Sequence, residues 1–577
     1  HSMIFGYAVT VVMFVSFIGL VAAVILGRRE LYLAIRPYVN RYSLAALAAL
    51  VLFFVLFSIF FVKPVEQLYF DENIYQGIAL NILHNGDAAW CQFGTAEVKS
   101  CPSSIVYHDP VGWSFFIAIV FWLFGPGKAV AYNFQLFVGA LSLIGIFLLS
   151  AVLFRRKDIP VYATAFVALN SEVFIWARTQ AAVDLPFMML TVFALFFFVV
   201  YIRRRSTYTI AMGIFSLVMV VYTRIEAFIL VPLLAVYYLT MGNSGIFRTI
   251  KSRIAEIAKS FRNPTFDRNL MFITVLIVML VPEILYIAMQ AHNGNYGQGS
   301  GALVSIKNFY SNIIPNLLFL AGQLNRTDYY PVVFPAELAF SALVGAVLLP
   351  EARGRRDKFA ILLFLGLLFF SFYIFYSFFY AGSVLYGVDV RFMLEVIPPL
   401  ALLAGFGIGA ISEYIMSLLN LVFGKQRVTK DLKYMFASVL VFLLAVYPFI
   451  SLAHRITIEP QDMPQQETIL NAVNFIYGNY TDVPQSCLVF SFTPDLWYTL
   501  NRSSVQIGYL GSTNATFVRF ESQFSCFVID YGYWCQVPPY KNTTCSSSLN
   551  KYKLSVIASM DDSHGDRFAL YRILNYS

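Results

Sequence analysis

The stretch SLAALAALVLFFVLFSIFFV, residues 43–62, decides the fold class because it runs for twenty residues without a charged side chain. A helix needs about twenty apolar residues to cross the hydrocarbon core of a bilayer. Soon after this run, YFDENIY at residues 69–75 places two carboxylates side by side. Acidic groups next to hydrocarbon are costly to desolvate, so Asp71 and Glu72 are candidate functional residues.

The rest of the chain repeats this apolar character. Of its 577 residues, 59% are hydrophobic and 12% are charged, whereas a soluble domain has about 25% charged residues. The pattern predicts an all-α polytopic membrane domain of about twelve spans. They fall near residues 3–27, 43–62, 129–154, 159–177, 180–201, 208–223, 226–242, 270–290, 333–350, 358–380, 391–416 and 434–453.

The net charge of +8 reflects membrane topology rather than a nucleic-acid partner. Of 40 Lys and Arg residues, 24 lie in six short segments between the predicted spans. Basic loops stay on the cytoplasmic side, so these segments fix the orientation of the chain. The segments are 28–41, 155–157, 203–205, 248–268, 353–358 and 425–433.

Cysteines and glycosylation sequons agree with this orientation, because all six of each lie outside the predicted cytoplasmic segments. An even number of extracytoplasmic cysteines indicates disulfides in an oxidising compartment. Cys91 with Cys101, Cys535 with Cys545, and Cys487 with Cys526 are the pairings we expect, although the four cysteines of the tail allow three connectivities. We therefore expect a multi-pass protein of the plasma membrane or an ER-like membrane.

The chain divides into three parts. Residues 1–42 form an extra N-terminal span and a cytoplasmic connector, and residues 43–453 form the main membrane domain. Its long first outer loop, 63–128, is expected to hold a helix near 73–83 and a short apolar helix, 111–124, at the outer interface. Residues 454–577 combine one amphipathic helix, 465–477, with five short strand patterns, which predicts a small extracytoplasmic α/β domain.

A second long outer loop, residues 292–330, begins with the glycine-rich stretch GNYGQGSGAL. Long loops of this kind serve as lids or binding loops, or simply connect two spans, and the sequence favours neither.

Ionisable residues from distant parts of the sequence are all predicted near the outer leaflet. Each could form a private ion pair with a neighbour, as Glu172 with Arg178 or Asp389 with Arg391. A shared polar cavity explains the whole set more simply, because unpaired charges cannot face lipid. The six histidines and six cysteines lack metal-ligand spacing, so the sequence indicates no metal and no cofactor, and a divalent cation is not required. The set comprises Asp71, Glu72, His108, Asp109, Glu172, Arg178, Asp184, Arg224, Glu226, Asp389 and Arg391.

Four segments in this order resemble the GT-C glycosyltransferases that use polyprenyl-phosphate sugars, especially the protein O-mannosyltransferases and lipid A aminoarabinose transferases. They cover roughly residues 43–416. The segments are YFDENIYQGIALNILHNGD (69–87), HDPVGWSFFIAIVFWLFGPG (108–127), ARTQAAVDLPFMMLTVFALFFF (177–198) and RFMLEVIPPLALLAG (391–405). The oligosaccharyltransferase branch fits less well, because its WWDYG signature is absent from the tail.

The resemblance implies roles for individual residues. Asp71 becomes the catalytic base, Glu72 its neighbour that orients the acceptor, and Asp184 the second functional acid. His108 and Arg391 become candidates for binding the donor phosphate, although Asp109 stands where the family has the first proline of a pair. The candidate substrate-binding set is completed by Arg178, Arg224, Tyr75 and Asp389.

The expected function is an inverting, metal-independent transfer of a sugar from a polyprenyl-monophosphate carrier to an acceptor hydroxyl on the extracytoplasmic face. The implied partners are this lipid donor, an acceptor protein, lipid or glycan, and the bilayer, with no nucleic acid. Two alternatives remain: a transporter or flippase whose charges line a pathway, and a catalytically inactive GT-C scaffold. Transporters typically carry internal repeats, and none is found in this sequence.

Overall fold

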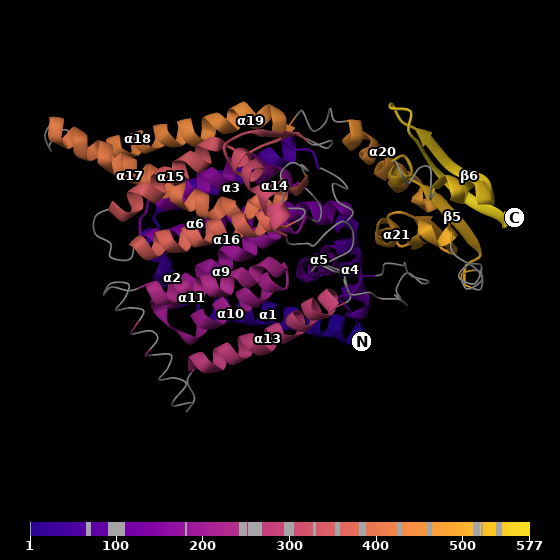
Figure 1. The fold of residues 1–577 in the computed structure, drawn as a ribbon, viewed down its shortest axis with the longest axis horizontal. Helices are drawn as coiled ribbons and strands as arrows, with labels where there is room; N and C mark the ends of the chain where they lie inside the picture. Colours follow the sequence, from indigo (N-terminus) through magenta and orange to yellow (C-terminus); the bar gives the residue numbers. More distant parts are fainter. Residues whose placement is uncertain are drawn as a thin grey trace.

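The computed structural model describes residues 2–64, 71–90, 110–178, 182–241, 268–292, 305–326, 331–351, 358–379, 388–423, 430–457, 464–511, 523–537 and 545–576, with single residues 251, 255 and 520. Its long helices lie side by side along the longest dimension of the molecule, and a β-sheet lies beyond one end of them (Figure 1). The predicted combination of a helical membrane domain and a small C-terminal α/β domain is confirmed.

Eight helical segments among the described residues are long and apolar enough to cross a membrane. Their helices are α1 (Ser2–Leu26), α3 (Arg41–Phe61), α6 (Lys128–Phe154), α9 (Asp184–Arg204), α13 (Arg268–His292), α16 (Lys358–Phe378), α17 (Ile397–Phe423) after the turn η5 (Val388–Val396), and α18 (Lys430–Val441) continued by η6 (Phe442–Val446) and α19 (Tyr447–Thr457).

Shorter helices account for the other predicted spans. They are α7 (Ile159–Ala168), α8 (Ser171–Trp176), α10 (Thr207–Val221), η2 (Ile225–Ile229), α11 (Leu230–Thr240) and α15 (Ala336–Glu351). Polar caps set several helix starts: Asn40 and Ser206 form capping boxes, and the Asn170 side chain accepts from the Glu172 amide. The Asn170 cap divides the predicted span 159–177 into α7 and α8.

Both helices expected in the first outer loop are present, α4 (Asp71–Asn85) and α5 (Gly112–Phe124). The second outer loop, expected at residues 292–330, contains elements that the sequence did not predict. They are the helix α14 (Ile306–Leu320) and a short hairpin of β1 (Leu324–Arg326) and β2 (Pro331–Val333). Ser305 caps α14, and Asn312 of this helix donates to the carbonyls of Ser377 and Phe379. The glycine-rich residues 293–304 lie outside the described residues, as do most residues of the basic segments 248–268, 353–358 and 425–433. Two short elements, α2 (Arg28–Ile35) and η1 (Arg36–Tyr38), follow α1.

The helical bundle has two distinct ends. At one end, which we call the domain end, Lys128 Nζ at the start of α6 lies 5.4 Å from the ring centre of Tyr477 in the C-terminal domain. At the other end, the far end, Arg203 of α9 donates to the Leu153 carbonyl near the end of α6. Because α9 ends at the far end, Asp184 at its start lies at the domain end.

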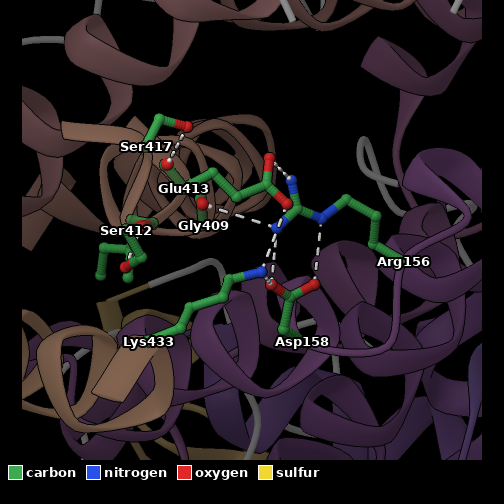
Figure 2. A network of polar contacts seen from close by, with 8 residues as sticks. Arg156, Asp158, Gly409, Ser412, Glu413, Ser417 and Lys433 are labelled. Atoms are coloured by element: carbon green, nitrogen blue, oxygen red, sulfur yellow. Dashed lines mark hydrogen bonds and ion pairs between the residues drawn. The ribbon is translucent and has the colours of Figure 1, made fainter. Parts of the chain in front are cut away.

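Four charged residues join helices at the far end, and we call them the far-end network: Arg156, Asp158, Glu413 and Lys433 (Figure 2). Arg156, after α6, lies 2.6 Å from Asp158 and 3.0 Å from Glu413 of α17. Lys433 of α18 lies 3.2 Å from both acids. The network therefore fastens the turn between α6 and α7 to α17 and α18.

The C-terminal domain is a five-stranded sheet of order β4-β3-β5-β7-β6 with parallel and antiparallel pairs. Its helix α20 (Pro464–Asn479) matches the predicted amphipathic helix. Both faces of the sheet are covered, because Val489 of β3 belongs to one apolar cluster and its neighbour Phe490 to another. The remaining elements are β3 (Cys487–Ser491), α21 (Pro494–Thr499), β4 (Ser503–Gln506), η9 (Ile507–Gly511), β5 (Cys526–Tyr531), α23 (Ser546–Lys551), β6 (Tyr552–Asp561) and β7 (Arg567–Tyr576), with the turns η8 (Tyr480–Asp482) and η10 (Tyr533–Cys535).

Two of the predicted disulfides are confirmed. Cys487 pairs with Cys526, which links the adjacent parallel strands β3 and β5. Cys535 pairs with Cys545. The third predicted pair, Cys91 with Cys101, lies outside the described residues.

Candidate functional site

Asp184 is the centre of a buried group of charges at the domain end. It is the first residue of α9, and its side chain is fully buried. Arg224 Nη1 donates to Asp184 Oδ1, and Arg224 Nη2 lies 2.9 Å from Glu226 Oε1. Arg391 Nε lies 3.8 Å from Asp184 Oδ2. We call Asp184, Arg224, Glu226 and Arg391 the domain-end cluster, which three distant parts of the sequence form together.

Aromatic rings surround the two guanidinium groups of this cluster. The Cζ atoms of Arg224 and Arg391 each lie 5.0 Å from the ring centre of Phe392. The ring of Tyr376 stacks on the ring of Phe392, with the ring centres 4.8 Å apart and the ring planes at 19° to each other. The negative ring faces attract cations, so Phe392 lets two like charges lie close together in a site that water barely reaches.

Local sequence explains why these side chains converge. Asp184 opens α9, where a carboxylate is favoured by the partial positive charge of the helix N-terminus. Arg224 follows α10 in an extended conformation, which turns the chain back into η2. Arg391 lies in η5, and Pro398 and Pro399 then occupy the first turn of α17, where a missing backbone N–H costs little.

A second group of buried residues lies on and around α4. Glu72 and Tyr75 are 1% and 2% exposed. Tyr132 of α6 is close enough to Glu72 and Arg178 to interact with both electrostatically. Arg178 donates through Nε to the Val62 carbonyl at 3.1 Å. The simple pairing of Arg178 with Glu172 is therefore not formed among the described contacts.

The start of α5 connects the first outer loop to the domain-end cluster. The Gly112 amide donates to the Tyr222 carbonyl at 2.6 Å, two residues before Arg224. A Cβ on residue 112 would lie 2.4 Å from that carbonyl oxygen, so only glycine permits this approach. The loop that follows α4 thus returns to the turn that carries Arg224.

The structure tests the placement of some predicted site residues and not of others. It brings Asp184, Arg224 and Arg391 together, and it places Glu72, Tyr75 and Arg178 around α4. The backbone at positions 71 and 389 is described, but the side chains of Asp71 and Asp389 are not. His108 and Asp109 lie outside the described residues.

Sequence reasoning missed Glu395 and the aromatic partners of the cluster. Glu395 is 3% exposed and interacts electrostatically with Asp184, Arg224 and Glu226. Its position four residues after Arg391 in RFMLEV was a usable signal, because residues at that spacing share one face of an α-helix, although this segment forms the 3₁₀ helix η5. Tyr376 and Phe392 had no such signal in a chain so rich in aromatic residues.

No group of three or more His, Cys, Asp or Glu side chains could hold a metal ion within the part of the chain that the structure describes.

Comparisons with known proteins place this geometry in a wider context. Residues 108–261 match the family model described as dolichyl-phosphate-mannose-protein mannosyltransferase. A comparison with curated protein sequences finds no match. The fold is similar to that of ArnT from Cupriavidus metallidurans in the apo state, with 12% identity, a TM-score of 0.54, and coverage of 92% of this chain and 97% of that chain. It is also similar to the Archaeoglobus fulgidus oligosaccharyltransferase AglB, with 13% identity, a TM-score of 0.49, and coverage of 92% and 74%.

The matched family segment contains Arg178, Asp184 and Arg224, and the likeness to ArnT extends over nearly the whole of both chains. The resemblance expected from the sequence is thereby confirmed: this chain has the GT-C fold shared by membrane glycosyltransferases.

Proposed function

We propose that this protein is a membrane glycosyltransferase that moves a sugar from a polyprenyl-monophosphate carrier to an acceptor hydroxyl. The observation that carries this proposal is the domain-end cluster, in which two guanidinium groups and two carboxylates are buried together at one end of the bundle. Guanidinium forks bind phosphate oxygens in pairs, which suits a lipid-phosphate leaving group.

In the proposed reaction, Asp71 accepts the proton of the acceptor hydroxyl, and Glu72 orients that acceptor. The hydroxyl oxygen attacks the anomeric carbon, the bond from this carbon to the phosphate oxygen breaks, and the configuration inverts. Arg391 stabilises the negative charge that develops on the departing lipid phosphate. Asp184, held by Arg224, keeps Arg391 in place.

The relatives support the donor class. The matched family is described as using dolichyl-phosphate mannose, and ArnT, whose apo form shares this fold, has also been solved with undecaprenyl phosphate. The two disulfides of the C-terminal domain support an extracytoplasmic site, because such bonds persist in oxidising compartments.

The test is a transfer assay with the purified protein in lipid nanodiscs and a panel of polyprenyl-phosphate sugars. Wild-type protein should transfer or hydrolyse at least one donor, and Asp71→Asn should lower turnover by about 10²–10⁴-fold, the usual contribution of a general base. Asp482→Asn changes an exposed acid of the C-terminal domain and should leave turnover unchanged. Near-normal turnover by Asp71→Asn would remove the base assignment, and movement of the carrier across the membrane of proteoliposomes without transfer would favour a flippase.

A further inference from the structure

The C-terminal domain meets the membrane domain where its short helix α21 packs against α4 (Figure 1). We propose that Asp495 of α21 is a positioning residue that holds α4 in place, so that a domain about 400 residues away in sequence sets the position of Asp71 and Glu72. The catalytic consequence rests on the proposed function, whereas the contact between the two domains does not.

Asp495 makes its hydrogen bond across the domain boundary. The side chain is 3% exposed, and Oδ2 accepts from Trp90 Nε1 at 3.1 Å. Trp90 follows α4 in the first outer loop and is itself 9% exposed. An indole N–H that is buried needs an acceptor, and Asp495 of the C-terminal domain supplies one to Trp90.

The same carboxyl group closes directly onto the backbone of α4. A Cβ added to Gly77 would lie 2.2 Å from Asp495 Oδ1, far inside van der Waals contact. Because Gly77 has no side chain, the carboxyl group of Asp495 can pack directly against the backbone of α4.

A second contact between α21 and α4 restricts how the two helices can rotate relative to each other. The Tyr498 hydroxyl lies 3.4 Å from His84 Nδ1, about two helical turns beyond Gly77. Two contacts at separate points on one helix restrict both its position along the boundary and its rotation. A single contact would allow α4 to pivot.

A second buried acid of the C-terminal domain gives a useful comparison. Asp530 accepts hydrogen bonds from Ser491 and Trp497, which belong to its own domain, so it serves the interior of that domain. The partners of Asp495 belong instead to α4 and to the loop after it. Burial raises the pKa of the Asp495 carboxyl to about 7, a cost that the fold of the C-terminal domain alone does not explain.

The position of α4 matters because this helix begins at Asp71, six residues before Gly77. At about 1.5 Å per residue, Gly77, which Asp495 contacts, lies about 9 Å along the helix from Asp71, the proposed base. A shift of about 1 Å in a reacting group can lower turnover by about a hundredfold. Release of α4 from α21 would therefore impair the reaction even if every catalytic side chain were retained.

The test combines hydrogen exchange of α4 with turnover in Gly77→Ala, Asp495→Ala and the double variant. Gly77→Ala should speed exchange over residues 71–85 by at least about tenfold, since the added methyl group displaces the carboxyl group, and should lower kcat more than it raises the KM of the donor. Gly478→Ala is the matched control, because a Cβ there meets nothing within 4 Å. It should behave like the wild type.

The double variant shows whether the two positions act through one contact. Without the Asp495 carboxyl group the added methyl group meets only the Cβ of residue 495, at 3.3 Å, so the double variant should exchange little faster than Asp495→Ala alone. Asp495→Asn keeps the shape and an acceptor for Trp90, and it should retain α4 protection within about twofold. If Gly77→Ala does not fold, the double variant should recover expression.

The proposal is overturned if Gly77→Ala exchanges like Gly478→Ala, or if the effects of the two single variants simply multiply in the double variant. Hydrogen exchange requires no turnover. A wild-type protein that protects α4 as described but transfers no sugar would refute the proposed function and leave this inference standing.

Discussion

The two ends of the helical bundle use the same residue types for different purposes. In the far-end network, Arg156 is 21% exposed and its partner Glu413 is 52% exposed (Figure 2). In the domain-end cluster, Asp184 is fully buried and Arg224 is 11% exposed. Partly exposed pairs such as Arg156 with Glu413 fasten helices together at little cost, although Asp158 in the same network is only 9% exposed. A buried set of charges pays a large desolvation penalty that stability alone does not justify.

This difference separates a structural network from a functional site. Three of the four far-end charges lie in or next to basic segments of the sequence, and solvent reaches Arg156, Glu413 and Lys433. The domain-end charges are surrounded by Phe392 and Tyr376, which keep water away from the guanidinium groups. A preorganised, poorly hydrated site is what stabilisation of a departing phosphate requires.

The largest expected effect comes from breaking the buried cluster. Arg224→Ala leaves the carboxylates of Asp184 and Glu226 without their shared partner, which should cost about 3–5 kcal/mol of stability. Thermal unfolding in nanodiscs measures this loss. A change no larger than that of Arg156→Ala would mean that burial does not distinguish the two ends.

A smaller effect concerns pH and the boundary between α21 and α4. The pKa of Asp495 is raised to about 7 by burial, so the docked state favours the protonated acid. Docking should be strongest at pH values below the ordinary pKa of Asp, near 3.8, and should weaken as the pH rises through about 7. The other titratable groups at this contact are His84 and Tyr498.

Hydrogen exchange of α4 between pH 5 and pH 8.5, corrected for intrinsic rates, measures this dependence. The wild type should lose protection with rising pH, and Asp495→Asn should lose less because it lacks the ionisable carboxyl group at this contact. An identical pH profile in both proteins would show that Asp495 is not the group responsible.

The smallest effect is expected in the far-end network. Arg156→Gln should cost about 1 kcal/mol or less and leave transfer unchanged, because the pairs are partly exposed. Burial raises the pKa of Asp158, but the hydrogen bond and charge of Arg156 and the charge of Lys433 outweigh this and lower it to about 2. Its contribution to stability should therefore persist above the ordinary pKa and fade only as the pH falls towards 2. Unfolding curves at pH 4 and pH 7 check this, and a large loss of turnover in Arg156→Gln would contradict it.

Sequence alone predicted the helical membrane domain, both helices of the first loop, a small C-terminal α/β domain and two disulfides, because each depends on local patterns of polarity and on compartment. Eight helices among the described residues are long enough to be spans, against the twelve predicted. It also grouped Asp184, Arg224 and Arg391 through membrane topology. It missed α14, whose position depends on contacts with the end of α16. It also missed the contact of Asp495 with Gly77, because a contact between residues about 400 positions apart leaves no local sequence pattern.

The most direct test of the central claim measures binding of polyprenyl monophosphate and of the corresponding polyprenol to the protein in nanodiscs. The wild type should bind the phosphate at least about tenfold more tightly than the alcohol, since each guanidinium hydrogen bond to a charged group contributes about 1.5–3 kcal/mol. Arg391→Gln should abolish this preference, and Arg156→Gln should retain it. A preference that survives Arg391→Gln, or one that is lost in Arg156→Gln, would contradict the assignment of the domain end as the phosphate site.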